Sequence, residues 1–123
     1  MRSLLLVAHG SRRRESNEEV RRLTLGIEER AGKRFDLVDC AFLELARPSI
    51  GEGIDAAAAK GASEITVLPY FLAAGTHVVN DIPEIVEDRR RTYPAVCIQV
   101  TPHMGAAPAL PDLLLGMVLV ADR

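Results

Sequence analysis

Two histidines of this 123-residue chain follow apolar runs that have the character of buried β-strands. His9 comes directly after the run Leu4–Ala8, and His77 follows the run Ile65–Leu72 after the short loop Ala73–Thr76. Imidazole is a good ligand for transition metals, and its ordinary pKa of about 6.5 lets it accept a proton near neutral pH. Parallel strands share one carboxyl edge, where α/β proteins bind ligands. The pair therefore predicts one metal site with coordination positions left open.

Each histidine, taken alone, also fits a structural role. His9 could be a polar cap on the core, and His77 could be the first residue of a helix without a ligand. Gly10 permits a tight turn close to a ligand, and Gly75 lets the backbone pass under a flat one. A metal site therefore requires the two histidines to meet at one edge of the sheet.

Three further groups fall near the same predicted edge. Glu44 interrupts the apolar run 41–45 at the end of the second expected strand, so it is either a solvated strand-end residue or a third convergent group. His103 follows the fourth expected strand and is interpreted as a peripheral loop residue rather than a ligand. The run Arg12–Arg14 is either a solvated loop or an attractor for an acidic substrate.

Composition narrows the class of protein. A chain of 123 residues fits one domain, 1–123, and 48% hydrophobic with 26% charged residues is ordinary for a globular protein. A net charge of −2 and 4% aromatic residues argue against nucleic-acid binding. No run reaches the roughly 18 apolar residues of a membrane span, and no signal peptide is recognisable. We expect a cytoplasmic protein with no membrane partner.

The two cysteines, Cys40 and Cys97, lie in strand-like runs and are expected to be buried thiols. Neither forms a C-x-x-C pair, so a thiolate zinc site or an iron–sulfur cluster is not supported.

Hydrophobic periodicity predicts strands that alternate with helices. The expected strands are Leu4–Ala8, Phe35–Leu45, Glu64–Leu72 and Ala95–Thr101. The expected helices run from a capping box at Ser16–Glu19 to Gly32, from Pro48 in a first turn to Gly61, over Val79–Thr92, and over an amphipathic segment Leu110–Ala121. This alternation predicts an α/β, flavodoxin-like three-layer sandwich around a mostly parallel four-stranded sheet in the order 2-1-3-4.

Three stretches in this order resemble the small CbiX-type sirohydrochlorin chelatases of the class II tetrapyrrole chelatase family. They are HGSR at His9–Arg12, FLELARPSI at Phe42–Ile50, and VLPYFLAAGTHVVNDIP at Val67–Pro83. The resemblance runs from about Leu4 to Gly105. His103 has no clear counterpart in the family pattern, and Arg12–Arg14 is more basic than usual for it.

The resemblance implies a single-lobe chelatase fold and ATP-independent insertion of a divalent metal, typically Co²⁺, into sirohydrochlorin. It implies that His9 and His77 bind the metal and that His9 accepts a proton. It also implies that Glu44 contacts the tetrapyrrole and that a loop contacts the macrocycle. The residues of that loop are Leu72, Ala73, Ala74, Gly75, Thr76 and His77. A homodimer is expected, because small members of the family pair two copies. No permanently bound cofactor is expected.

The alternatives are a sirohaem ferrochelatase or a nickel chelatase of the same family, with Fe²⁺ or Ni²⁺ as the metal substrate. An alternative of another class is a carrier that binds metal or tetrapyrrole without inserting one into the other. A histidine phosphatase is disfavoured because Ala8, not arginine, precedes His9.

Overall fold

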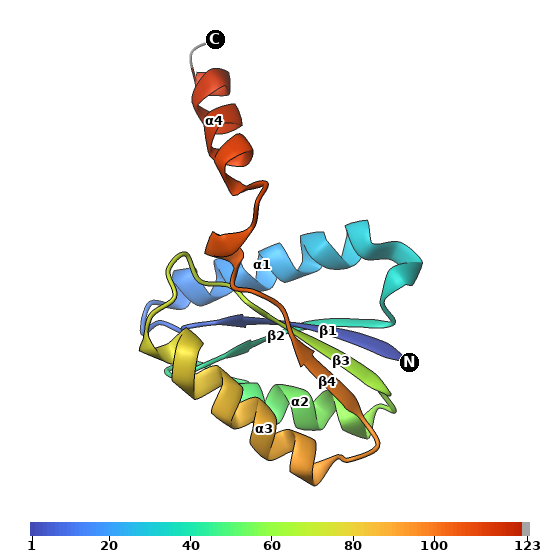
Figure 1. The fold of residues 1–123 in the computed structure, drawn as a ribbon. Coiled ribbons are helices and arrows are strands. Elements are labelled where there is room, and N and C mark those ends of the chain that lie inside the picture. Colours follow the sequence, from blue (N-terminus) through green and yellow to red (C-terminus); the bar gives the residue numbers. More distant parts are fainter. Residues whose placement is uncertain (122–123) are drawn as a thin grey trace.

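One parallel sheet forms the centre of the molecule (Figure 1). The structure is a computed structural model, which describes residues 1–121 except for the side chain of His77. Its strands are β1 (Arg2–Ala8), β2 (Leu37–Phe42), β3 (Glu64–Pro69) and β4 (Cys97–Val100). All three strand pairs are parallel, and the order is β2-β1-β3-β4. This confirms the predicted order and places the ends of β1 and β3 side by side.

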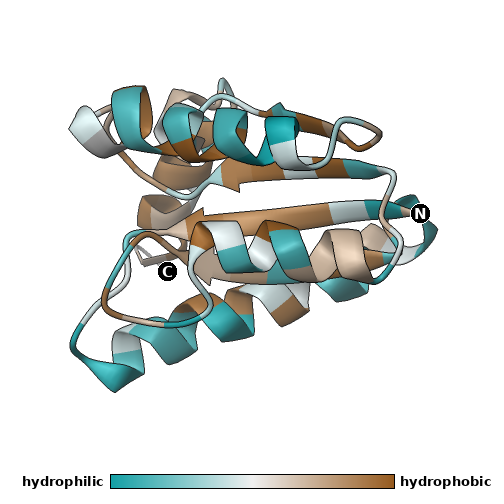
Figure 2. Cartoon of the chain, turned by 90° about the horizontal axis from the view of Figure 1, so that it is seen from below, coloured by the Kyte–Doolittle hydropathy of each residue, from teal (hydrophilic) through white to brown (hydrophobic). Residues whose placement is uncertain are grey.

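Helices cover both faces of the sheet, which completes the predicted sandwich. Helix α1 (Arg14–Ala31) lies on one face, whereas α2 (Ile50–Ala59) and α3 (Ile82–Thr92) lie on the other (Figure 1). The strands are mostly hydrophobic and the helices carry many hydrophilic residues (Figure 2). The last helix, α4 (Leu110–Ala121), extends away from the sheet (Figure 1).

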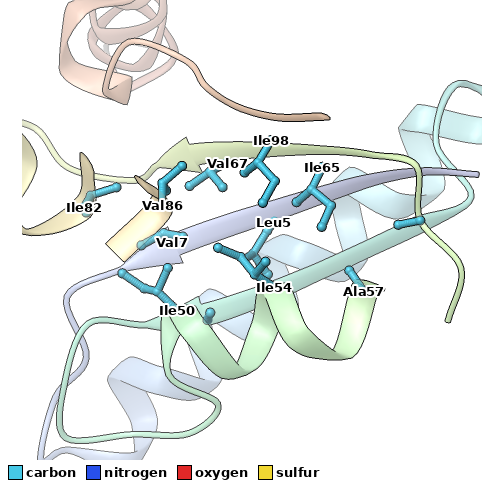
Figure 3. Close-up of a cluster of buried hydrophobic side chains, with 12 residues drawn as sticks. Leu5, Val7, Ile50, Ile54, Ala57, Ile65, Val67, Ile82, Val86 and Ile98 are labelled. Atoms are coloured by element: carbon cyan, nitrogen blue, oxygen red, sulfur yellow. The ribbon is translucent and has the colours of Figure 1, made fainter. Parts of the chain in front are cut away.

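The main core lies between the sheet and the pair α2–α3. It gathers Leu5 and Val7 from β1, Ile65 and Val67 from β3, and Ile54 from α2, all at most 1% exposed (Figure 3). Leu4 and Leu6 alternate with these residues and are buried on the face of α1. Because β1 is buried on both faces, it forms a fixed platform for the residue that follows it, His9.

The predicted capping box of α1 is wrong. Helix α1 begins at Arg14, its N-cap is Arg13 without a side-chain cap, and Ser16 lies inside the first turn. Asn17 packs inward, and the N-cap lies three residues before the predicted one. The capping box occurs in α2 instead, where Ser49 Oγ accepts from the amide of Glu52 and the Glu52 carboxylate accepts from the amide of Ser49. Pro48 therefore precedes the N-cap instead of lying in the first turn.

The strands are shorter than their apolar runs. Strand β2 ends at Phe42 instead of Leu45, and β3 ends at Pro69 instead of Leu72. Their central neighbour β1 ends at Ala8, so little backbone remains for the longer runs to pair with. The edge strand β4 covers only Cys97–Val100, and Cys97 is exposed, so the prediction of a buried thiol is wrong there.

The predicted last helix is confirmed over Leu110–Ala121, but it does not bury one face as an amphipathic helix would. No described side chain of α4 is buried, although its sequence is almost wholly apolar. The helix instead packs on the short 3-10 turn Met104–Ala106 that follows β4.

Candidate functional site

His9 and Glu44 form a pair at the carboxyl edge of the sheet. His9 Nε2 lies 3.3 Å from Glu44 Oε1, and His9 Nδ1 lies 3.1 Å from the carbonyl of Gly10. Both side chains are about half exposed, at 45% and 53%. The prediction left open whether Glu44 is solvated or convergent, and the structure brings it into contact with His9.

The backbone holds this pair in place. Beyond the end of β2, the amides of Leu43 and Glu44 donate to the carbonyls of Ala8 and His9 at 2.9 and 3.0 Å. The loop that carries Glu44 closes on itself, because the amide of Phe42 donates to the carbonyl of Pro48 at 2.8 Å. The pairing of β1 and β2 thus continues past the end of β2 as far as His9 and Glu44.

Gly10 allows the two loops to approach each other. It has φ +94°, and a Cβ atom built there would lie 1.8 Å from the carbonyl oxygen of Glu44. The sequence predicted a glycine for close approach to a ligand, but its closest neighbour is the backbone of Glu44. Leu45, the next residue, has φ +64°, a left-handed conformation that costs a non-glycine residue about 1 kcal/mol. Local strain of this kind accompanies functional sites.

Asn17 is a site-forming residue that the sequence analysis missed. Its side chain is buried at the start of α1, where Oδ1 accepts from the amide of Ser11 at 3.0 Å and Nδ2 donates to the carbonyl of Ser11 at 2.8 Å. The Ser11 hydroxyl in turn accepts from the amide of Arg13 at 3.0 Å. These bonds fix the turn that follows His9. The available signal was a polar residue at helical spacing with Val20 and Thr24.

The loop after β3 is exposed, and it leads into the helix that covers the core. Leu72 is 70% exposed, and residues 73–76 are exposed as well. His77 begins a π-helical turn, His77–Asp81, that runs directly into α3. The prediction started this helix at Val79, whereas α3 itself begins at Ile82. π-Helical turns are rare in proteins, and those that occur are often found at functional sites.

The backbone of His77 therefore lies eight residues beyond the end of β3, at the carboxyl edge that also carries His9. Its side chain lies outside the described part of the structure. The prediction that His9 and His77 share a metal stays a prediction.

The loop that begins at Leu72 is anchored by the turn after β4. The amide of Gly105 donates to the carbonyl of Phe71 at 2.9 Å, and a Cβ atom at Gly105 would lie 1.7 Å from the carbonyl oxygen of Leu72. Gly105 therefore fits closely beneath the start of the expected macrocycle loop. This contact joins the site to the segment that leads into α4.

The remaining candidates lie around the pair. Arg12 and Arg13 are exposed in the turn after His9, and Arg14 opens α1. His103 is half-buried in the loop after β4, and its role as a peripheral residue stays a prediction. Among the described side chains, no three His, Cys, Asp or Glu groups cluster as a complete protein-only metal cage would require.

One strong pKa shift lies at the end of the loop that carries Glu44. The Arg47 guanidinium pairs with the Glu52 carboxylate, which also accepts from the amide of Ser49. This ion pair and hydrogen bond lower the pKa of Glu52 to about 2. Their effect is to tie the loop to the N-terminus of α2.

Fold and site together define a parallel α/β sandwich with a histidine–carboxylate pair at the carboxyl edge of its central strands. The CbiX family profile matches residues 3–119, and the chain belongs to the CbiX family.

Two relatives named as chelatases for different metals illustrate the range of the family. The chain is 35% identical over 126 residues to the sirohydrochlorin cobaltochelatase of Saccharolobus solfataricus, covering 98% of this chain and 91% of the relative. It is 32% identical over 111 residues to the chloroplastic sirohydrochlorin ferrochelatase of Arabidopsis thaliana, covering 90% and 48%. The chain spans about half the length of several curated relatives that it matches.

Solved structures agree with the fold. A CbiX protein from Marinobacter aquaeolei VT8 has a TM-score of 0.84 and 28% identity, covering 98% of this chain and 97% of that one. The sirohydrochlorin chelatase SirB of Bacillus subtilis subspecies spizizenii, solved in complex with cobalt, has a TM-score of 0.76 and 29% identity over 83% of this chain and 43% of its own. No helix in the described part of the chain is long and apolar enough to cross a membrane.

Proposed function

We propose that this protein inserts a divalent metal, Co²⁺, into sirohydrochlorin without ATP. The observation that carries the proposal is the 3.3 Å contact between His9 Nε2 and Glu44 Oε1 at the carboxyl edge of β1 and β2. The family relatives that act on sirohydrochlorin support the tetrapyrrole as substrate. Cobalt and iron chelatases both occur among them, so the choice of cobalt is part of the proposal.

Metal insertion requires two pyrrole N–H protons to leave the macrocycle. His9 can accept one of them through a ring nitrogen, and the Glu44 carboxylate beside it can orient the ring or receive the proton. In this proposal, His9 and His77 hold the incoming metal, and two protein ligands leave positions open for the four macrocycle nitrogens.

The surroundings suit a broad, acidic ring. The exposed Leu72 and the small residues 73–76 form an apolar loop against which the macrocycle can lie. The exposed Arg12 and Arg13 lie in the turn after His9, where they can attract the carboxylates of sirohydrochlorin. A tetrapyrrole is a disc with two faces, so we also propose that two copies of the chain pair as a homodimer to enclose it.

The test mixes metal-free protein with sirohydrochlorin and with Co²⁺, Fe²⁺ or Ni²⁺ in parallel reactions. The absorption change of the macrocycle measures the rate of metal insertion. The expected result is catalytic insertion that is fastest with Co²⁺ and independent of ATP. His9→Ala should abolish turnover, whereas His103→Ala, a histidine outside the pair, should retain it. A spectral change that stops at one equivalent of protein would instead identify a carrier and overturn the proposal.

A further inference from the structure

Helix α4 exposes an apolar surface that no other described part of the chain covers. Leu113, Leu114, Leu115, Met117, Val118, Leu119 and Val120 are each between 52% and 67% exposed. Asp112 is the only charged residue in the described helix. A helix that is apolar all round is normally buried, and twelve residues span only about 18 Å, too short for a membrane span. The helix therefore requires a protein surface as its cover.

The accessible surface of the whole chain is also larger than expected for a compact monomer of its mass. The accessible surface is 7,890 Å², whereas a compact monomer of 13.4 kDa exposes about 6,500 Å². The surplus of roughly 1,400 Å² falls within the roughly 1,200–2,000 Å² of total surface that a specific interface buries. Most of the chain is a compact sandwich, so the projecting α4 accounts for this excess (Figure 1).

A second uncovered surface lies on the sheet, and it includes the hydrogen-bonded polar pair Gln99–Thr66. Helix α1 packs on β2, and among the described residues no helix lies in the same way over β3 and β4 on that face of the sheet (Figure 1). Ile98 points into the core with α2 and α3, so its neighbours Cys97 and Gln99 point to the opposite face, and both are exposed. On β3, Thr66 and Leu68 alternate in the same way with buried residues and are only half-buried.

An apolar hollow continues this surface toward the root of α4. Leu68, Thr101, Met104 and Ala106 contribute to its lining. The same chain thus carries both an apolar helix without a cover and a sheet surface without a helix.

The link between them holds α4 pointing outward. The amide of Ala107 donates to the carbonyl of Met104 at 3.0 Å, and the amide of Leu110 donates to the carbonyl of Ala107 at 3.1 Å. Folding α4 back onto its own sheet would break this continuous turn, whereas docking it on another molecule would preserve it.

We propose that two copies of this chain exchange their α4 helices, each helix docking on the β3–β4 half-face of the other copy. This inference rests on the homodimer proposed above and identifies its interface. Exchange of an identical element satisfies both copies at once through a two-fold axis. It also connects assembly to the site, because Gly105, in the turn at the root of α4, packs under the loop that starts at Leu72.

Cross-linking between two distinguishable copies tests the proposal. One copy carries Cys40→Ala and keeps Cys97 on β4 as its only thiol. The other copy carries a different affinity tag and the substitutions Cys40→Ala, Cys97→Ala and Val118→Cys. After mixing, a short bismaleimide should join the two tags in one cross-linked species. The control places the cysteine at Leu25 of α1, which is 60% exposed, and should give no cross-link.

A single chain that carries both Cys97 and Val118→Cys shows which sheet α4 covers. Cross-links within one chain would show that α4 folds back on its own sheet, and they would overturn the exchange while leaving a dimer possible. Sedimentation at micromolar concentration should give a dimer for the wild type and for Leu25→Glu, but a monomer for Leu114→Glu. A dimer that survives Leu114→Glu, or a wild type that sediments as a monomer, would also overturn the exchange. Cross-linking and sedimentation do not measure turnover. A result that overturns the helix exchange therefore leaves the proposed chelatase activity untouched, and the reverse also holds.

Discussion

The side chain of Asn17 brackets the backbone of Ser11 with two hydrogen bonds, one to its amide at 3.0 Å and one to its carbonyl at 2.8 Å. Ser11 lies two residues after His9, so a buried amide in α1 determines the path of the turn that follows the proposed proton acceptor. An amide suits this place because it donates and accepts at the same time. A carboxylate or a hydroxyl of similar size cannot form both bonds in the same geometry.

We therefore expect Asn17→Ala to lower both stability and turnover. Leaving a buried backbone group without its partner costs about 1–3 kcal/mol, so the part-buried groups of Ser11 should cost less than that upper value, and the freed turn should misplace His9. Asn17→Asp keeps the acceptor and loses the donor, so it should be intermediate. Urea unfolding and sirohydrochlorin turnover measure the two effects.

The matched control is Thr24→Val, a change at the other buried polar residue of α1. The Thr24 hydroxyl donates to the carbonyl of Val20 in its own helix and does not contact the turn. It should leave turnover unchanged. An Asn17→Ala protein with wild-type kcat would show that the turn keeps its shape without the bracket.

The sheet and its functional edge could be predicted from the sequence because buried parallel strands leave continuous apolar runs. Leu4–Ala8 is such a run, and its end fixes His9 at the carboxyl edge. The ends of β2 and β3 could not be predicted in this way. They depend on where β1 stops, and hydrophobicity at Leu45 or Leu72 carries no information about a partner strand.

The contact between His9 and Glu44 was predictable only as a possibility. It depends on backbone pairing beyond the last strand residue and on Gly10, whose neighbour could not be known before the loops were placed. The surface that covers α4 could not be predicted for a different reason. The apolar pattern of Leu110–Ala121 predicts that the helix is covered, but the same pattern would serve a surface of its own chain or of another.

Gly10→Ala should disrupt the site more than its backbone angle alone explains. A Cβ atom there would overlap the Glu44 carbonyl at 1.8 Å, so the two loops must separate. Gly61→Ala is the matched control, because Gly61 has a similar φ of +99° with no atom within 4 Å of the added Cβ. Gly61→Ala should cost about 1–2 kcal/mol from strain alone.

The expected result is that Gly10→Ala unfolds at a clearly lower urea concentration than Gly61→Ala and loses turnover that Gly61→Ala retains. Equal loss of stability in the two variants would mean that the overlap relaxes without moving Glu44.

The ion pair of Arg47 and Glu52 predicts a pH dependence of stability. The pKa of Glu52 is lowered to about 2 from an ordinary value of 4.5, chiefly by its hydrogen bond to Arg47. A lowered folded-state pKa stabilises the fold above the unfolded-state pKa, and this contribution disappears as the pH falls from about 4.5 toward 2. Glu52→Gln should therefore be less stable than the wild type near pH 6, and the gap should close toward pH 2.

Urea unfolding between pH 2 and pH 7 measures the gap. Arg47→Gln is the reciprocal variant, and Glu52→Gln should have a smaller effect in its background, because the largest cause of the shift is gone. A gap between wild type and Glu52→Gln that stays constant over the whole pH range would show that the carboxylate has no lowered pKa in the folded protein.

Glu44→Gln tests the carboxylate of the proposed site without changing its shape. The side chain is 53% exposed, and an exposed ion pair contributes at most about 1 kcal/mol, so thermal unfolding should stay near that of the wild type. Turnover should fall, because the amide cannot receive a proton from His9. A positioned acid–base group contributes about 10²- to 10⁴-fold to a rate, and we expect kcat to drop at least about tenfold.

The matched control for Glu44→Gln is Glu87→Gln. Glu87 is 52% exposed and pairs with Arg90 on α3, so the two substitutions remove the same charge from similar surroundings. Only Glu44→Gln should change turnover. A rise in KM with kcat unchanged would show that Glu44 binds the macrocycle equally in the ground and transition states. Wild-type kcat and KM in Glu44→Gln, with His9→Ala inactive, would remove Glu44 from the chemistry, and its contact with His9 would then serve only the arrangement of the two loops.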